Sequence, residues 1–227
     1  MIRILLGQPG TGKTITAVKF VVDSKIPCFT NFAVKSKNCI RLKWEHIITY
    51  EKNNKGENVN PKLNWKFWRE QIKKHGGFHV VIDELHNLMH ARRAMSKTNV
   101  LLSTWVAQIR KITGANEHAH FIVISQELER IDVSVRDLAN DITLCDKRQR
   151  GHASTKVKSG KKYVTVKVPQ TYIRLTHFNG GQCTERYRVF RDTGNRTHDY
   201  RSYFYANPYM YAYDSYELID FGMEEYL

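Results

Sequence analysis

The sequence predicts an α/β fold, with a mostly parallel sheet covered by helices on both faces and a small antiparallel, β-rich C-terminal extension. Continuous apolar runs of strand length occur at Ile2–Leu6, Phe78–Ile82 and Phe121–Ser125. Helical patterns separate these runs, and such an alternation is typical of a parallel sheet. Beyond Lys147 the apolar residues alternate with period two between turn signals, which indicates antiparallel strands.

The first apolar run leads directly into a motif that fits the phosphate-binding pattern G-x-x-x-x-G-K-[ST], formed by Gly7, Gln8, Pro9, Gly10, Thr11, Gly12, Lys13 and Thr14. A helix is expected directly afterwards, over Ile15–Asp23. The glycines allow backbone N–H groups to wrap a phosphate, and the helix N-terminus favours negative charge. Lys13 would reach the β- and γ-phosphates of ATP, and the Thr14 hydroxyl would bind Mg²⁺.

The following segments alternate between strand and helix signals. A second strand is expected over Ile26–Phe32, a short helix over Trp44–Tyr50 and an exposed polar loop over Glu51–Asn64. Apolar residues at spacings of three and seven then predict an amphipathic helix that begins at Trp65 and ends before Gly76.

The second half of the chain divides at the change of pattern. A long helix is expected from about Asn99 to Gly114, another around Val135, and a fifth strand over Ile142–Cys145. We therefore expect an ATPase core at residues 1–149 and a basic, β-rich extension with an acidic aromatic tail at 150–227. Strands are expected in the extension at Tyr163–Val168, Thr171–Thr176 and Arg186–Arg191.

Polar residues follow two of the apolar runs. Asp83 and Glu84 follow the run that ends at Ile82, and Gln126 follows the run that ends at Ser125. Ligands of open parallel sheets bind outside the carboxyl ends of the strands. Asp83 is suited to holding Mg²⁺. Glu84 is suited to polarising the attacking water, and Gln126 to positioning that water or sensing the γ-phosphate.

An arginine often stabilises the charge that develops on a transferred phosphoryl group, and a neighbouring subunit can supply it. Arg136 is the first candidate, because it follows the strand that ends at Gln126. Arg92, Arg93 and Arg110 are alternatives. For each of them, a surface or DNA-facing charge is the simpler interpretation.

The composition is that of a globular chain with a polyanionic partner. The formal net charge is +14, which favours nucleic acid as that partner. From Arg150 to Arg201 there are 12 Lys or Arg against 3 Asp or Glu, whereas residues 207–227 hold 5 acids and no Lys or Arg. The four cysteines form no C-x-x-C pair, no apolar run is long enough to span a membrane, and we expect no targeting segment before the first strand.

With these residues placed, the chain resembles the FtsK–HerA group of P-loop motor ATPases, which share a RecA-like fold. It is most similar to the viral branch, the genome-packaging ATPases and the zonula occludens toxin (Zot)-like assembly ATPases of filamentous phages. The resemblance depends on Gly7–Thr14, the segment Val80–His86, the segment Ala91–Ser96, Ser125-Gln126 and the segment from Asp132 to Arg136, with a weaker similarity in the tail at Tyr213–Glu217.

The resemblance implies an ATPase that forms a ring, with a hexamer expected, and moves DNA through its pore. In the family, Lys13 and Thr14 match the Walker A positions, Asp83 and Glu84 the Walker B positions, and Gln126 the polar sensor. A virus-encoded protein in the host cytoplasm or the virion, packaging the viral genome with a capsid or portal partner, is the leading hypothesis. The alternatives are a Zot-like phage assembly ATPase, a DExH-type helicase, a nucleotide kinase, and a non-catalytic nucleic-acid-binding scaffold with a vestigial phosphate loop.

Overall fold

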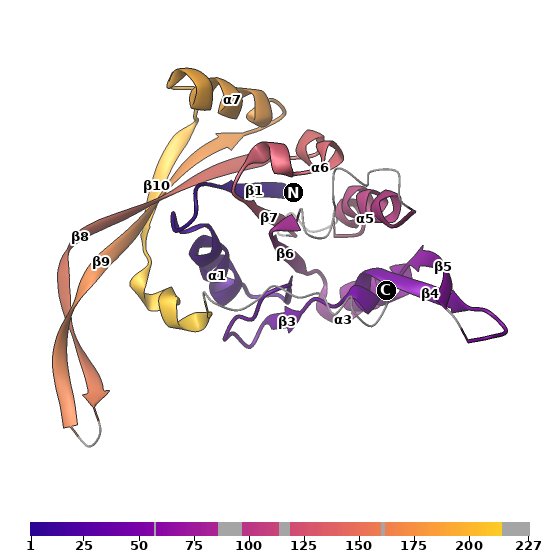
Figure 1. Ribbon diagram of the computed structural model, residues 1–227, viewed down its shortest axis with the longest axis horizontal. Helices are drawn as coiled ribbons and strands as arrows, with labels where there is room; N and C mark the ends of the chain where they lie inside the picture. The colour runs from indigo at the N-terminus through magenta and orange to yellow at the C-terminus, as the bar shows by residue number, and fades with distance from the viewer. Residues whose placement is uncertain (57, 86–96, 114–118, 160–161, 215–227) are drawn as a thin grey trace.

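The structure is a computed structural model that describes residues 1–56, 58–85, 97–113, 119–159 and 162–214 (Figure 1). Its centre is an eight-stranded sheet in the order β10-β9-β8-β1-β7-β6-β2-β3. The strands are β1 (Ile2–Leu6), β2 (Cys28–Thr30), β3 (Cys39–Arg41), β6 (His79–Asp83), β7 (Phe121–Ser125), β8 (Asp141–Ser159), β9 (Lys162–Asn179) and β10 (Tyr200–Tyr205). The β8–β9 and β9–β10 pairs are antiparallel, whereas the pairs from β8 through β1, β7, β6 and β2 to β3 are parallel. The predicted fold class is confirmed.

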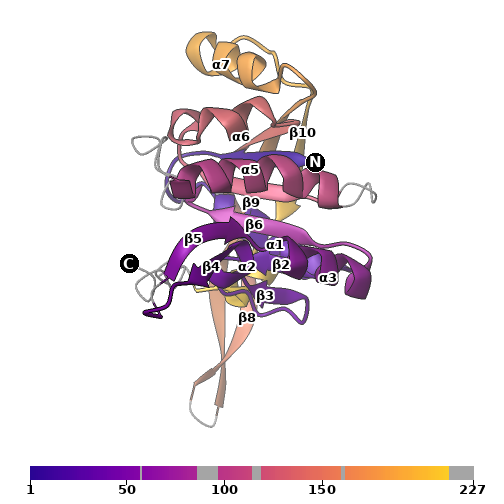
Figure 2. The same cartoon turned by 90° about the vertical axis from the view of Figure 1, so that its right-hand side faces the viewer.

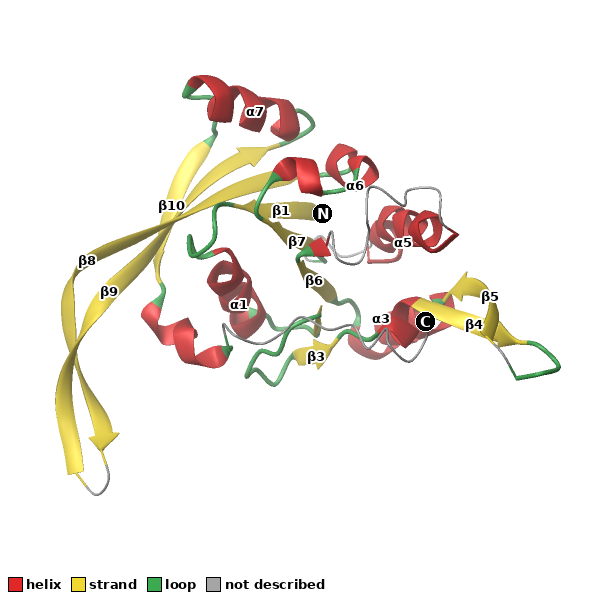
Figure 3. Cartoon of the chain, in the orientation of Figure 1, coloured by secondary structure: helices red, strands yellow, loops and turns green. Residues whose placement is uncertain are grey.

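Helices cover both faces of this sheet (Figures 2 and 3). Side chains alternate along each central strand: Ile4 and Ile82 belong to the core cluster that contains Trp105, whereas Leu5 and Val81 belong to the cluster that contains Val18. One face carries α1 (Lys13–Asp23) and the 3₁₀ helix η3 (Asn207–Ala212). The other carries α2 (Trp44–Ile47), α3 (Trp65–His75), α5 (Lys97–Thr113), η2 (Leu128–Arg130), α6 (Val133–Asp137) and α7 (Cys183–Thr193).

The expected loop over Glu51–Asn64 is wrong. The structure has a hairpin there, formed by β4 (Ile48–Lys52) and β5 (Asn58–Leu63). Its base is the pair Ile48 and Leu63, both of which pack on the core. The rest of the hairpin is polar, so the sequence carries little of the alternation that reveals a strand.

The strand expected over Arg186–Arg191 is also wrong, because this segment lies in helix α7. Cys183, Tyr187 and Phe190 recur at helical spacing and belong to or pack on the core, with the rings of Tyr187 and Phe190 5.7 and 5.4 Å from that of Phe178. The alternation of Arg186 and Arg188 with apolar neighbours resembles a strand pattern by coincidence.

The expected fifth strand over Ile142–Cys145 is the start of a much longer strand. β8 pairs with β9 along its full length and runs without interruption across residue 149. Beyond a bulge between Gln149 and His152, the two strands leave the sheet as a two-stranded ribbon that we call the arm (residues 150–159 and 162–169), which projects far from the sheet in Figure 1. The described part of the chain contains no helix long and apolar enough to cross a membrane.

Candidate nucleotide-binding site

The segment between β1 and α1 is folded as a compact loop. Thr11 donates twice to the carbonyl oxygen of Gln8, from its backbone nitrogen at 3.2 Å and from its hydroxyl at 2.8 Å. Gly12 has a φ of 96°, and a Cβ at this position would lie 2.4 Å from Cδ1 of Ile173. The left-handed backbone at position 12 therefore favours glycine, and the Ile173 side chain of β9 would have to shift to make room for a Cβ there.

The Lys13 side chain lies under this loop. Its ammonium donates to the carbonyl oxygen of Gln8 at 3.1 Å, and the residue is buried. Burial lowers the pKa of Lys13, and the carboxylates of Asp83 and Glu84 act in the opposite direction. A phosphate group in the loop would give this desolvated cation a charged acceptor, so the arrangement of the loop and Lys13 suits an anion.

Asp83 lies at the carboxyl end of β6, next to the start of α1. Its Oδ2 accepts a hydrogen bond from the Thr14 hydroxyl at 2.9 Å, and the residue is buried. Burial raises the pKa of Asp83 to about 6; the Thr14 bond and the Lys13 charge lower this pKa, and Glu84 raises it. The structure thus brings together Thr14 and Asp83, the two oxygen donors predicted for Mg²⁺.

Asn31 fixes the backbone at Asp83 and was not predicted as a site residue. Its side-chain amide donates to the carbonyl oxygen of Asp83 at 2.7 Å, and its Oδ1 accepts from the Asp83 nitrogen at 2.8 Å. Asn31 is fully buried just after β2. A single Asn after a strand has no distinctive sequence signal; the parallel pairing of β2 with β6 gives it this position.

Glu84 and Gln126 meet across the neighbouring strands β6 and β7. Gln126 Nε2 donates to Oε1 of Glu84 at 3.3 Å, and the Glu84 nitrogen donates to the carbonyl oxygen of Ile124 at 3.1 Å. Glu84 has a φ of 51°, a left-handed conformation that is uncommon for residues other than glycine. Such backbone strain persists where neighbouring contacts hold it and is concentrated at functional sites.

Arg136 lies elsewhere. It is on α6, and its carbonyl oxygen accepts from Ala139 and from the Thr184 hydroxyl, while Asn140 bonds to Ile2 at the start of β1. This places Arg136 near the amino ends of the strands, the edge opposite the phosphate loop. Its Nε is buried without a hydrogen-bond partner among the described residues. Arg92, Arg93 and the Arg110 side chain lie outside what the structure describes.

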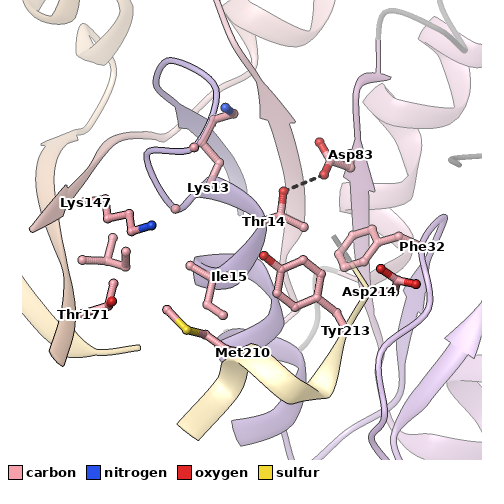
Figure 4. Close-up of a pocket in the computed structure, with 13 residues that line it drawn as sticks. Lys13, Thr14, Ile15, Phe32, Asp83, Lys147, Thr171, Met210, Tyr213 and Asp214 are labelled. Carbon is pink, nitrogen blue, oxygen red and sulfur yellow. Dashed lines mark hydrogen bonds between the residues drawn. The ribbon is translucent and has the colours of Figure 1, made fainter. Parts of the chain in front are cut away.

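A pocket of about 520 Å³ opens beside the loop (Figure 4). The loop, α1 and β6 form one side of it, and β8, β9 and the segment that includes η3 form the other. The residues that line the pocket are Gly10, Gly12, Lys13, Thr14, Ile15, Phe32, Asp83, Lys147, Thr171, Ile173, Met210, Tyr213 and Asp214. Burial and the negative charge of Asp83 raise the pKa of Tyr213, in agreement with its position beside the site. The contribution of Met210 and Tyr213 could not be foreseen, since some 200 residues separate them from the loop in sequence.

Comparison with solved structures identifies chains of similar architecture. The N-terminal domain of zonular occludens toxin from Neisseria meningitidis matches with 16% identity and a TM-score of 0.50, over 94% of this chain and 98% of that domain. The genome-packaging NTPase B204 from Sulfolobus turreted icosahedral virus 2, in complex with ATPγS, matches with 14% identity and a TM-score of 0.39, over 63% of this chain and 74% of that one. A KaiC-like protein from Pyrococcus horikoshii matches with 9% identity and a TM-score of 0.40, over 75% and 84% of the two chains.

Sequence comparison identifies the family. A search of curated protein sequences finds no match. The family model described as "ATPase family associated with various cellular activities (AAA)" matches residues 3–146. This range is more than half of the chain and contains the phosphate loop, Asp83, Glu84 and Gln126. The chain therefore belongs to the AAA family of P-loop ATPases.

Proposed function

We propose that this ATPase is a DNA translocase that acts as an oligomeric ring, and that its role is to package a viral genome. One observation carries the proposal: the wall of the ATPase pocket is also the base of a basic, two-stranded arm. Lys147, Thr171 and Ile173 line the pocket, and the same two strands, β8 and β9, continue into the arm. A polyanion on the arm and a nucleotide in the pocket would therefore contact one continuous ribbon.

Hydrolysis would use the residues gathered around the loop. Lys13 and the loop N–H groups bind the β- and γ-phosphates, and Thr14 and Asp83 hold Mg²⁺ through hard oxygen donors of the kind this ion prefers. The ion, when bound, neutralises charge on the phosphate oxygens. Glu84 accepts a proton from the attacking water, and Gln126, hydrogen-bonded to Glu84, orients that water.

Arg136 would act on a neighbouring subunit. Its position at the amino ends of the strands keeps it away from the loop of its own chain, so its charge can stabilise a transferred phosphoryl group only across an interface between subunits. A closed ring, with a hexamer expected, supplies such an interface at every site.

The arm is proposed to bind DNA. Between Lys147 and Thr184 the sequence holds Lys and Arg but no Asp or Glu. In the described part of the arm, Arg150, Lys156, Lys162 and Lys167 form no ion pair, and all four are exposed. By contrast, Arg186, Arg188 and Arg191 of α7 are paired with acids of the same chain. The arm thus presents basic side chains that no acid of the described chain neutralises, and a two-stranded ribbon has a width that the DNA major groove admits.

A second candidate is a Zot-like assembly ATPase of a filamentous phage. The fold match to the zonular occludens toxin domain supports it, because that match extends over 94% of the chain and so includes most of the region beyond residue 149. Both candidates require an ATP-driven oligomer that acts on DNA. The two candidates differ in the partner. In the packaging role the partner is a capsid or portal, and the protein acts inside the infected host cell or the virion.

The test measures the rate of ATP hydrolysis as a function of protein concentration, with and without single- and double-stranded DNA. We expect turnover per chain to rise with concentration, because Arg136 must come from a neighbour, and to rise again with DNA. Arg136→Ala should remove the concentration dependence, and Arg136→Lys should restore part of it. Hydrolysis that is independent of concentration and DNA, from a chain that stays monomeric with nucleotide, would overturn the proposal.

A further inference from the structure

The described C-terminal segment (residues 207–214) is held against the nucleotide-binding part of the molecule. The backbone nitrogen of Lys35 donates to the carbonyl oxygen of Ala212 at 2.7 Å, and the hydroxyl of Tyr209 donates to Asp23 at 3.3 Å. The Lys19 ammonium lies 5.5 Å from the centre of the Tyr209 ring. Ala212 is buried against the core. The segment therefore has a fixed position across α1 rather than being a loosely attached tail.

Two side chains of this segment, Met210 and Tyr213, line the pocket, and Tyr213 also packs against the core cluster that contains Val18. Met210 is 41% exposed and Tyr213 half-buried. In Figure 4 they stand beside Ile15 of α1, with Phe32 beyond Tyr213. The pocket thus has a polar side at Lys13, Thr14 and Asp83, and the C-terminal segment adds the apolar and aromatic side chains of Met210 and Tyr213 together with the carboxylate of Asp214.

This division matches the two halves of a nucleotide. The loop holds phosphates, so the nucleoside must leave the loop through the same pocket, and its base needs flat or polarizable apolar surface. A tyrosine ring stacks on a purine or pyrimidine, and a methionine thioether packs against aromatic rings. The volume of about 520 Å³ is within the range of small-molecule sites.

We propose that Met210 and Tyr213 form the nucleobase subsite of this ATPase, with Ile15 and Ile173 completing its apolar surface. The inference rests on the proposed binding of nucleotide phosphates by the loop. It assigns a binding role to a segment that lies outside the range matched by the family model. The base contact would also fix the C-terminal segment more firmly against α1 when nucleotide is bound.

The test compares two ligands on the full chain, the non-hydrolysable analogue AMPPNP and inorganic tripolyphosphate, which lacks a nucleoside. Met210→Ala and Tyr213→Ala should each raise the Kd for AMPPNP about tenfold, the effect of losing one stacking contact, and leave the Kd for tripolyphosphate unchanged. Tyr213→Phe keeps the ring and should bind AMPPNP like the unaltered chain. Tyr211→Ala is the matched control, because Tyr211 is in the same segment but is 73% exposed and does not line the pocket.

Equal losses for both ligands would show a structural role for Met210 and Tyr213 and overturn the inference, as would unchanged AMPPNP binding. Lys13→Ala separates this failure from that of the proposed function. If the loop binds the phosphates, this substitution should weaken the binding of both ligands, wherever the base lies. A second measurement avoids substitutions: ATP carrying a photoreactive azide on adenine should label a peptide containing residues 207–214. Labelling confined to other segments would place the base elsewhere.

Discussion

Strand β9 passes through two different environments, and the contrast between its halves is informative. Near its end, Phe178 is fully buried beneath α7, and neighbouring residues pair with β8 on one side and β10 on the other. Near its start, Tyr163 is 70% exposed, and the strand pairs with β8 alone. The C-terminal half of β9, in the sheet, is held by burial of apolar surface. The N-terminal half, in the arm, is held by a single ladder of hydrogen bonds.

The contrast shows what each half is for. An isolated hairpin is marginally stable in water, so the arm depends on the sheet that continues from it. The side chains of the arm do not pack in a core, so they can be charged, or apolar and exposed as Val164 and Val166 are. The sheet therefore supplies the stability, whereas the described part of the arm carries exposed basic side chains with no acid beside them.

The largest expected effect separates the two halves by stability. Phe178→Ala should lower the free energy of unfolding by about 3–5 kcal/mol, because it leaves a cavity among packed aromatic rings. Tyr163→Ala, on the same strand, should change it by less than about 0.5 kcal/mol. Urea denaturation followed by circular dichroism measures both. Similar losses from the two substitutions would contradict the distinction.

The next effect concerns catalysis by Glu84, which follows strand β6 of the central sheet. Glu84→Gln should reduce ATP turnover about 10²-fold while nucleotide affinity is retained, because the amide cannot accept the proton but keeps the size and the contact with Gln126. Steady-state hydrolysis and equilibrium binding of AMPPNP measure the two quantities. Tyr163→Ala serves as the arm control and should leave basal turnover unchanged. Unaltered turnover in Glu84→Gln would require another base.

A third effect tests the buried charge of Asp83. Its pKa of about 6 lies above the ordinary value of 3.8, so the folded chain binds a proton that the unfolded chain has lost, and stability falls as pH rises through this window. In metal-free buffer, Asp83→Asn should raise the free energy of unfolding by on the order of 2 kcal/mol at about pH 8 and by almost nothing at about pH 4. Asp137→Asn, at an exposed residue of α6, is the control, and a gain that does not depend on pH would refute the assignment.

The smallest effect belongs to the arm. Replacing Lys156, Lys162 and Lys167 by alanine should flatten the dependence of DNA affinity on salt by about one unit of slope per lost phosphate contact, with little change in stability. Replacing three exposed lysines of α3 (Lys66, Lys73 and Lys74) removes the same charge from another surface. Fluorescence anisotropy with labelled DNA at several salt concentrations measures both slopes. If the α3 variant shows the larger change, the arm is not the DNA site.

Most of the fold could be predicted because its signals are local. The apolar runs that became β1, β6 and β7 are buried on both faces, which leaves little alternative to a parallel sheet. The errors occurred where the signal is weak or ambiguous, as in the polar hairpin β4–β5 and the helix α7. The length of β8 was missed because its outer half buries almost nothing, and hydrophobic periodicity reports burial.

The residues of the candidate site that directly follow a strand could be predicted from the sequence. The structure brings Thr14 to Asp83 and Gln126 to Glu84, as parallel strands with a common edge require. Asn31, Met210 and Tyr213 were not foreseen, since their positions follow from tertiary packing and no spacing in the sequence indicates it. The catalytic and metal-binding roles themselves remain predictions that the substitutions above examine.

The continuity of β8 from the pocket to the arm has a mechanical consequence. From Lys147 at the pocket to Ser159 near the tip, the strand rises roughly 40 Å. A ribbon of this length, if tilted as a rigid unit at its base beside the pocket, would act as a lever. A tilt of about 10° at the pivot would displace the tip by roughly 7 Å, so that a small change beside the phosphates becomes a displacement of molecular size at the far end.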